Sequence, residues 1–294
     1  MNNRARLTDA PLPRLAPRAA DSHKGTYGRA LLVGGSRGMA GAISLAGISC
    51  LRSGAGLVRI ATAQACADVV AGFEPAYMTV ALADDGAGRI ASAALETVLQ
   101  QCDAADAVAL GPGLGRSDGL DELVARMIAD VACPLVVDAD GLNALASRTD
   151  VLPGAAGPCV LTPHSGEFAR LVGADQPLPL DDARDRADLF AAEHGVVVVL
   201  KGHRTYITDG DTCAWNETGN PGMATGGSGD VLTGMISGLL AQGLSCFDAA
   251  RLATHVHGLA GDLAARELGQ VSLVASDLPR YLPAAFRRTA ESSD

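Results

Sequence analysis

Residues 216–234 read Asn-Glu-Thr-Gly-Asn-Pro-Gly-Met-Ala-Thr-Gly-Gly-Ser-Gly-Asp-Val-Leu-Thr-Gly, and a helical pattern continues directly from them. A segment this rich in glycine and threonine is not the interior of a strand. The helix expected over 228–242 carries a single apolar stripe, made of Val231, Leu232, Met235, Ile236, Leu239 and Leu240. Unhindered backbone N–H groups therefore lie at a helix N-terminus, where they bind anions, on Gly226, Gly227, Ser228 and Gly229.

Asp230 comes next, in the first turn of the expected helix. A carboxylate beside a bound phosphate is electrostatically costly, so we expect it to have a task, such as accepting the proton of a hydroxyl group. The alternative is a helix cap, because the helix dipole favours an acid at this end. A cap has no use for glycines at so many nearby positions, so we predict that Asp230 is catalytic.

Short, continuously apolar runs alternate with helical patterns along the chain. Strands are expected at 30–34, 57–61, 107–110, 135–137, 159–161 and 196–200, and helices at 40–53, 91–101, 117–129, 181–194, 228–242 and 247–266. Strands that are apolar at every position are typical of a parallel sheet covered by helices on both faces. Within 204–216, Asp209-Gly210 separates two β-rich runs and predicts a hairpin, so the sheet should end in antiparallel strands. We predict a loose arm at 1–22 and one α/β catalytic domain over 23–294.

Composition narrows the class of protein. The net charge of −10 disfavours nucleic acid and anionic membranes as partners. The seven cysteines are widely spaced and odd in number, which indicates reduced thiols in a cytoplasmic protein. We find neither a signal peptide nor an uncharged stretch long enough to span a membrane.

Two charged segments follow expected strands, where ligands of parallel sheets bind. Lys201 comes after the run 196–200 and could reach a phosphate, with Gly202 allowing close backbone approach; the alternative is an ordinary solvated strand exit. His164 and Glu167 follow the run 159–161 and could contact a ligand. The alternative there is a helix start capped by Thr162 or Ser165.

Two further loops also follow strands. Asp138 and Asp140 could hold Mg²⁺ through water or organise a phosphate site, or could cap a helix. The glycines of 111–115 would let a ligand lie against the backbone. No Walker A sequence is present, so a P-loop does not hold the nucleotide. His255 and His257 lie two apart on a helix and hence on different faces, so they are poor metal ligands.

The motifs together resemble the ribokinase-like superfamily and, within it, the ADP-dependent NAD(P)H-hydrate dehydratase family. The similar segments run in the same order over about residues 23–285: His23-Lys24-Gly25-Thr26-Tyr27-Gly28, Gly34-Gly35-Ser36, 111–115, 138–143, 162–167, 201–205 and 220–232. The run Gly219-Asn220-Pro221-Gly222-Met223-Ala224-Thr225 is specific, because a sugar kinase is not expected to carry it.

The resemblance implies a ribokinase-like three-layer α/β/α sandwich with a mainly parallel central sheet and antiparallel edge strands. It implies repair of hydrated NADH or NADPH (NADHX, NADPHX), with ADP or alternatively ATP as phosphoryl donor, and Mg²⁺. The C6 hydroxyl would be phosphorylated and lost as phosphate. Many relatives carry an N-terminal epimerase domain, whereas only the arm precedes residue 23 here, so we expect a separate epimerase to act alongside. We also expect a homo-oligomer.

The resemblance also implies roles for single residues. Asp230 would activate the hydroxyl group, and Gly226, Gly227, Ser228 and Gly229 would hold the transferring phosphoryl group. The hydrate would contact Ala42, Gly113 and His164 besides Asp230. The nucleotide site would be lined by Lys201, Gly202, His203, Arg204 and Thr205. Metal ligands remain unassigned.

Two other functions stay open. A kinase for a small alcohol, of the thiazole or pyridoxal type, would share Asp230 and the glycine-rich turn. A non-catalytic nucleotide sensor would bind ADP without turnover, although the retained Asp230 argues against it.

Overall fold

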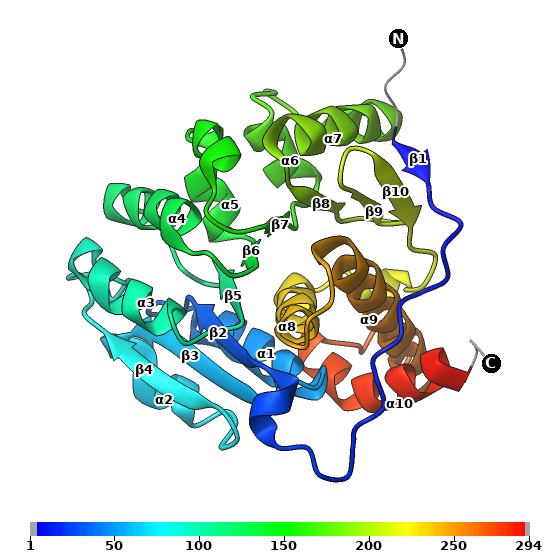
Figure 1. The fold of residues 1–294 in the computed structure, drawn as a ribbon, viewed down its shortest axis with the longest axis horizontal. Helices are drawn as coiled ribbons and strands as arrows, with labels where there is room; N and C mark the ends of the chain where they lie inside the picture. The colour runs from blue at the N-terminus through cyan, green and yellow to red at the C-terminus, as the bar shows by residue number, and fades with distance from the viewer. Residues whose placement is uncertain (1–4, 292–294) are drawn as a thin grey trace.

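The computed structural model describes residues 5–291, which are built around one ten-stranded sheet. The strands lie in the order β1-β10-β9-β8-β7-β6-β5-β2-β3-β4 (Figure 1). Pairing is parallel from β4 to β8, antiparallel for β8–β9 and β9–β10, and parallel again between β10 and β1. The bounds are β1 Arg6–Leu7, β2 Arg29–Val33, β3 Leu57–Ala63, β4 Met78–Leu82, β5 Ala107–Leu110, β6 Leu135–Val137, β7 Cys159–Leu161, β8 Val197–Leu200, β9 Tyr206–Thr208 and β10 Thr212–Trp215.

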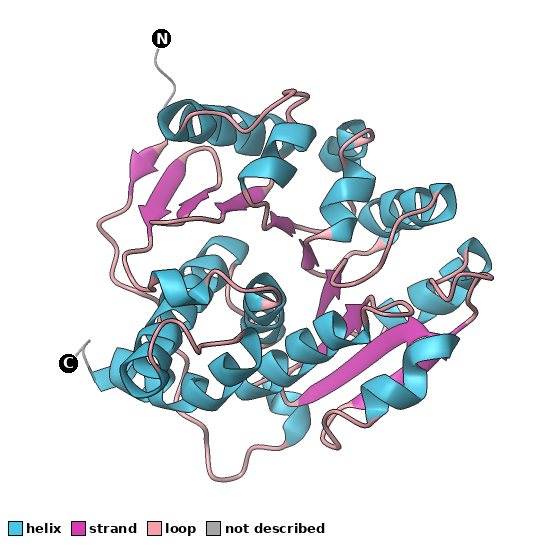
Figure 2. Ribbon diagram, turned by 180° about the vertical axis from the view of Figure 1, so that it is seen from behind, coloured by secondary structure: helices cyan, strands magenta, loops and turns pink. Residues whose placement is uncertain are grey.

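Helices cover both faces of this sheet. Neighbouring residues of a strand point to opposite faces. Leu32 belongs to the core cluster that includes residues of α1, α8, α9 and α10, and Leu31 belongs to the cluster that includes residues of α3 to α7. Figures 1 and 2 show these two groups on opposite sides of the curved sheet. The bounds are α1 Ala40–Arg52, α2 Ala67–Ala71, α3 Leu95–Cys102, α4 Asp118–Asp130, α5 Asp140–Leu145, α6 Ser165–Leu171, α7 Leu180–His194, α8 Ser228–Ala241, α9 Cys246–Leu268 and α10 Leu278–Glu291. The predicted three-layer α/β/α class with antiparallel strands toward one edge is confirmed.

The segment expected to be a loose arm is attached to the body from residue 5 onward. Strand β1 pairs with β10, and the backbone N–H of Ala5 donates to Asp188 Oδ2 at 3.0 Å. Farther along, Arg251 donates to the carbonyl of Ala10 at 2.6 Å, and Arg18 donates to the carbonyl of Gly54 at 2.6 Å. The contacts at Ala5, β1, Ala10 and Arg18 attach this segment to the body, and β1 satisfies backbone groups at the open edge of β10. The division of the chain at residue 23 stays a prediction.

None of the helices between residues 5 and 291 has the length and apolar character needed to cross a membrane.

Candidate active site

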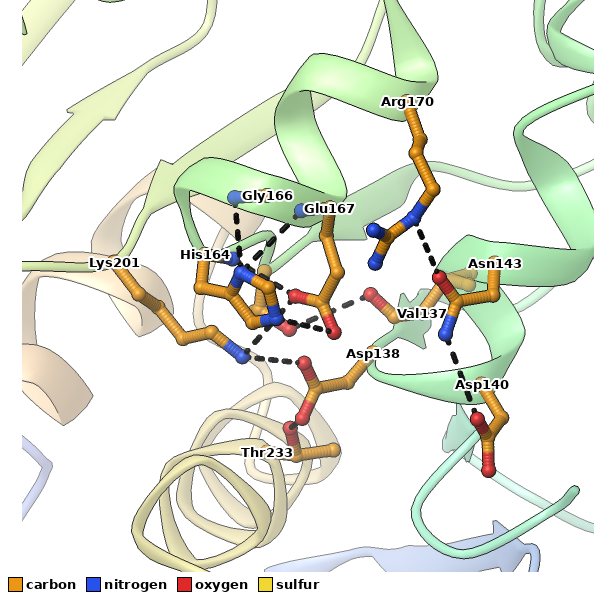
Figure 3. Close-up of polar contacts among 11 residues, drawn as sticks. Val137, Asp138, Asp140, Asn143, His164, Gly166, Glu167, Arg170, Lys201 and Thr233 are labelled. Carbon is orange, nitrogen blue, oxygen red and sulfur yellow. Dashed lines mark hydrogen bonds and ion pairs between the residues drawn. The ribbon is translucent and has the colours of Figure 1, made fainter. Parts of the chain in front are cut away.

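The loops after β5, β6, β7 and β8 converge beside the N-terminus of α8. These strands are adjacent and parallel, so their carboxyl ends share one edge of the sheet. The charged loops singled out from the sequence lie there together (Figure 3).

A buried ion pair forms the centre of this cluster. The ammonium Nζ of Lys201 lies 2.7 Å from Asp138 Oδ1, and Thr233 Oγ1 donates to Asp138 Oδ2 at 2.7 Å. Asp138 is 1% exposed and the Lys201 side chain 18% exposed. Burial alone would raise the pKa of Asp138, but the Lys201 charge and hydrogen bonds from Lys201 and Thr233 outweigh it and hold that pKa below its usual value. Both partners are therefore charged at neutral pH.

The pair places a positive charge under the glycine-rich turn. A Cβ atom built on Gly229 would lie 3.1 Å from Lys201 Nζ. Burial lowers the pKa of Lys201, but the carboxylates of Asp138 and Glu167 outweigh this effect. The pKa is therefore above its usual value, and the ammonium group stays protonated. The sequence prediction of a lysine near the anion-binding turn is consistent with this position. The structure adds that Asp138 holds the lysine.

His164 caps α6 with its own side chain. Its Nδ1 accepts hydrogen bonds from the backbone N–H groups of Gly166 at 3.0 Å and Glu167 at 3.3 Å. Glu167 Oε2 accepts in return from the N–H of His164 at 2.8 Å, which completes a capping box. The capping alternative named Thr162 or Ser165, and the structure assigns the cap to His164 instead. Burial and the nearby charges of Lys201 and Arg170 lower the pKa of His164, so the ring is neutral.

Asp230 has a different environment from the other carboxylates. Within residues 5–291 no group donates a hydrogen bond to its carboxylate, whereas Asp138 and Glu167 each accept at least one. Burial and the nearby Asp138 charge raise the pKa of Asp230 to about 7, against an opposing contribution from Lys201. A carboxylate with a pKa near neutrality and free lone pairs is suited to accept a proton from a ligand.

The turn before Asp230 is built to expose backbone amides. Gly227 is the N-cap of α8 with φ 97° and ψ −13°, a left-handed conformation that favours glycine. A Cβ atom there would lie 2.7 Å from Leu45 Cδ1 on α1. In the part of the chain that the structure describes, the N–H groups of Gly226, Gly227 and Gly229 donate to no protein acceptor. They remain available to an anion. The N–H of Ser228, which was predicted to act with them, donates instead to the carbonyl of Thr225 at 3.3 Å.

The preceding run 216–225 is fastened to α9. Both oxygens of Asp262 accept hydrogen bonds, from the N–H of Gly219 and from Asn220 Nδ2, each at 3.0 Å. Farther along the turn, Ser228 Oγ lies 3.4 Å from His257 Nε2. Burial lowers the pKa of His257 to about 4, so this contact does not titrate near neutral pH. The specific Gly-Asn-Pro-Gly sequence thus anchors the turn on its neighbouring helix.

The segment predicted to line the nucleotide site leaves β8 as a turn. Thr205 Oγ1 donates to the carbonyl of Gly202 at 3.1 Å, and Arg204 has φ 57°. Gly202 and His203 are exposed, and Arg204 Nη2 donates to Glu217 at 3.0 Å. Lys201 points into the charged cluster, whereas Arg204 is engaged with Glu217. The nucleotide contacts of 201–205 stay predictions.

Ala42 and Gly113 lie against each other at the start of α1. A Cβ atom on Gly113 would lie 3.1 Å from Ala42 Cβ and 2.4 Å from the carbonyl of Met39. Leu45, one turn along α1 from Ala42, contacts Gly227. The two residues predicted to bind substrate are therefore near the glycine-rich turn, although their contacts with substrate remain predictions.

Asp140, after β6, is hydrogen-bonded to the loop that follows β5. Its Oδ2 accepts from the N–H of Gly115 at 2.9 Å, and Asn143 Nδ2 lies 3.5 Å from its Oδ1. Asn143 in turn accepts from Arg170 Nε at 3.0 Å (Figure 3). The described residues contain no group of three His, Cys, Asp or Glu side chains placed to hold a metal ion. Mg²⁺ is usually bound by one or two carboxylates together with phosphate oxygens and water, so a role of Asp138 or Asp140 at a metal ion stays a prediction.

The contacts that were not predicted from the sequence include those of Thr233 and His257. Thr233 interrupts the apolar face of α8 one turn after Asp230 and is fully buried, which is a usable signal for a buried polar contact. His257 offered no such signal, because its partner Ser228 is 29 residues away.

Comparison with known proteins gives one consistent family. The model of the NAD(P)H-hydrate dehydratase family matches residues 30–284. A bifunctional NAD(P)H-hydrate repair enzyme of Moorella thermoacetica is 46% identical over 98% of this chain and 55% of its own length. An ADP-dependent (S)-NAD(P)H-hydrate dehydratase of Xanthomonas campestris is 37% identical over 97% of this chain and 95% of its own length. The chain thus spans about half the length of the bifunctional relative and nearly all of the other.

Similar solved structures indicate the same family and its fold. An ADP/ATP-dependent NAD(P)H-hydrate dehydratase of Bacillus subtilis, co-crystallised with ATP and Mg²⁺, has a TM-score of 0.80 at 34% identity, covering 96% of this chain and 99% of that one. A ribokinase-like superfamily protein of Enterococcus faecalis has a TM-score of 0.79 at 28% identity, covering 94% and 92%. The fold is therefore ribokinase-like.

Proposed function

The chain belongs to the NAD(P)H-hydrate dehydratase family, and we propose that it converts hydrated NADH and NADPH back to NADH and NADPH with ADP as phosphoryl donor. The proposal rests on Asp230. The pKa of its carboxylate is near 7, and no group among residues 5–291 donates a hydrogen bond to it. It stands directly after a turn whose backbone amides are available to an anion.

The reaction needs a base and an anion site at one place. Hydroxide is a poor leaving group, so the C6 hydroxyl of the hydrated ring is first phosphorylated: its oxygen attacks the terminal phosphorus of ADP, its proton goes to Asp230, and AMP leaves. The lone pair of the ring nitrogen then expels phosphate from C6. Loss of a proton from C5 restores the dihydronicotinamide, so the sum is hydrate plus ADP giving NAD(P)H, AMP and phosphate.

The residues around Asp230 support these steps. The N–H groups of Gly226, Gly227 and Gly229 would hold the transferring phosphoryl group, since amides at a helix N-terminus stabilise negative charge without reorganising. Lys201, held by Asp138, would add one positive charge below that group. Gly202, His203, Arg204 and Thr205 would line the nucleotide site, and Ala42, Gly113 and His164 the hydrate site.

We propose Mg²⁺ as the companion of the nucleotide, bound mainly by its phosphates. ATP is the alternative donor. The epimerase that would interconvert the two hydrate epimers is proposed to be a separate protein or domain.

Product analysis tests the proposal. Hydrated NADH is incubated with the protein and ADP or ATP while the absorbance of the dihydronicotinamide and inorganic phosphate are followed together. A dehydratase produces both in equal amounts. A small-alcohol kinase would leave a stable phosphoester and release no phosphate, and a nucleotide sensor would show neither product, so either outcome would reject the proposal.

Asp230→Asn tests the assigned base. The amide keeps the size of the side chain and loses its basicity, so turnover should fall by on the order of 10²–10⁴ while ADP still binds. Asp118→Asn is the matched control, because Asp118 is also an acid in the first turn of a helix, α4, and has no role assigned to it. If both variants lose activity alike, Asp230 is only a helix-stabilising acid.

A further inference from the structure

A groove outside the charged cluster lies between α1 and the start of α10. Its volume is about 370 Å³, within the range of roughly 300–1,000 Å³ usual for small-molecule sites. It is lined by Gly41, Ser44, Leu45, Ile48, Arg52, Phe73, Ser276, Pro279 and Arg280. The α1 residues recur every three or four positions, so they form one face of that helix. At a rise of 1.5 Å per residue, the wall from Gly41 to Arg52 is about 16 Å long.

Both walls of the groove begin at the glycine-rich turn. Leu45 lines the groove, and its Cδ1 atom is the nearest neighbour of a Cβ built on Gly227, at 2.7 Å. The next neighbour of that Cβ is Ala275, at 3.1 Å, and Ala275 directly precedes the lining residue Ser276. The groove is therefore continuous with the place where the phosphoryl group and the reacting ring are proposed to meet.

The groove combines apolar walls with two cations. Leu45, Ile48, Phe73 and Pro279 offer apolar contact, and no lining residue is an acid. Within residues 5–291, neither Arg52 nor Arg280 has a carboxylate within 4.0 Å. Their guanidinium groups are exposed.

Two acids, Glu74 and Asp277, adjoin lining residues of the groove along the chain, and each accepts a hydrogen bond from the backbone. Glu74 Oε1 accepts from the N–H of Ala76 at 3.0 Å, and Asp277 Oδ2 accepts from the N–H of Val274 at 3.1 Å. In a protein with a net charge of −10, the groove is thus a local surface that suits a ligand with an apolar ring and negative charge.

We propose that this groove binds the adenosine-phosphate half of the hydrated dinucleotide, with the adenine against Ile48 and Phe73 and phosphate oxygens bound by Arg52 and Arg280. The inference rests on the proposed function, because it assumes that the reacting half of the same substrate lies at Asp230. The dinucleotide is longer than its reacting ring, so its other half needs a contiguous surface with this chemistry. ADP does not compete for the groove, since its site is proposed at the end of β8.

A truncated substrate distinguishes binding of the adenosine-phosphate half from binding of the reacting nicotinamide half. Hydrated NADH is compared with hydrated reduced nicotinamide mononucleotide, which keeps the reacting ring and lacks the adenosine-phosphate half. The double variant Arg52→Ala/Arg280→Ala should lower kcat/KM for hydrated NADH about tenfold or more, mainly through KM, since each lost charge-assisted contact weakens binding. Its kcat/KM for the mononucleotide should stay within about twofold of wild type.

Two companion variants sharpen this comparison. Phe73→Ala should give the same pattern through lost apolar contact. Arg287→Ala is the matched control, because Arg287 is an exposed arginine two turns farther along α10 and outside the groove. Thermal melting of each variant checks that the fold is intact.

The outcomes are distinct. Equal losses for both substrates, or an Arg52→Ala/Arg280→Ala enzyme that behaves like Arg287→Ala, would overturn the groove assignment and leave the dehydratase proposal standing. A change of oligomeric state in sedimentation velocity, without the substrate-dependent difference, would identify the groove as a contact between copies of the chain and also overturn it. Failure of the wild-type protein to convert either substrate with ADP would reject the proposed function itself.

Discussion

Asp230 and Asp138 lie in the same cluster but have opposite protonation behaviour. Asp138 is paired with Lys201 and stays ionised, whereas Asp230 has no donor among the described residues and is raised to a pKa of about 7 by burial and by the Asp138 charge. One carboxylate thus positions the cation, and the other is left to exchange a proton with a ligand. This separation of two acids by environment is a common arrangement in enzymes.

The pKa of Asp230 predicts the pH dependence of turnover. A base works in its deprotonated form, so activity should rise with pH through about 7 and level off above it. Lys201 lowers the pKa of Asp230, so Lys201→Met should move this rise to higher pH as well as weaken ADP binding. The measurement is kcat/KM between about pH 5.5 and pH 9. A rise that stays at the same pH in Lys201→Met would show that another group controls it.

Removing Asp138 should destabilise the fold more than removing an exposed acid. Asp138→Ala removes the nearer partner of the largely buried Lys201 and leaves only Glu167 Oε2, at 3.8 Å from its Nζ. We expect this to cost on the order of 3 kcal/mol in the free energy of unfolding. Asp130→Ala is the control, because its pair with Arg126 is solvent-exposed and such pairs contribute little to stability. Urea denaturation compares the two. Equal losses would mean that the Lys201–Asp138 pair adds no more than a surface contact.

At the level of elements, the segment from Gly226 to Gly229 directly precedes Asp230, the proposed base, at the start of α8. Its conformation depends on one glycine more than on the others. Gly227 has φ 97° and faces Leu45 and Ala275, whereas a Cβ atom on Gly226 would meet nothing within 4 Å.

Alanine substitutions at these two glycines should therefore differ. Gly227→Ala forces a left-handed conformation on a residue with a Cβ, at a cost of about 1–2 kcal/mol, and displaces the amides that are proposed to hold the phosphoryl group. We expect a lower melting temperature and a large loss of turnover. Gly226→Ala should keep the melting temperature of wild type. Similar melting temperatures for both variants would show that the turn tolerates side chains throughout.

Most strands and helices follow from local pattern, and the exceptions have physical reasons. The strands at 107–110, 135–137 and 159–161 lie at the predicted bounds, because continuous apolarity marks a strand buried on both faces. Strand β4 was not predicted, since it is an edge strand and most of its residues are partly exposed. Helix α10 was not predicted either, because Pro283 lies inside it and obscures the helical pattern.

The site was predictable as a set of loops but not as a set of contacts. Parallel strands place their following loops at one edge, so Lys201, His164 and Asp138 could be expected there together. Their pairing could not be read from spacing, because Lys201 and Asp138 lie 63 residues apart and each also had a plausible local role. The cap formed by His164 was not predicted for a different reason. Its contacts with Gly166 and Glu167 are close in the sequence, but histidine is an uncommon N-cap residue.

At the scale of the whole molecule, a chain with a net charge of −10 is proposed to hold two anionic ligands at once. Attraction by the overall field is not available, so affinity has to come from backbone amides, from Lys201 and from Mg²⁺. Lys201 is largely buried, and amide dipoles within a site are screened less by salt than exposed charges are.

This predicts that ADP affinity varies only weakly with added KCl at fixed free Mg²⁺. Calorimetric titration across a salt series measures it. A steep loss of affinity would instead indicate exposed cations, and would move the nucleotide away from the glycine-rich turn. The expected homo-oligomer is a separate prediction, which sedimentation velocity on the wild-type chain checks.

In the proposed reaction, the C6 oxygen of the hydrate leaves as part of phosphate. To follow this oxygen, hydrated NADH is prepared in ¹⁸O-water, so that the C6 hydroxyl carries the label, and is converted with ADP in unlabelled water. One ¹⁸O atom is expected in each inorganic phosphate released, read by mass spectrometry, because the labelled oxygen attacks phosphorus and departs with it. Unlabelled phosphate, with the label found in water, would mean that ADP is hydrolysed separately and that the hydroxyl group is not phosphorylated.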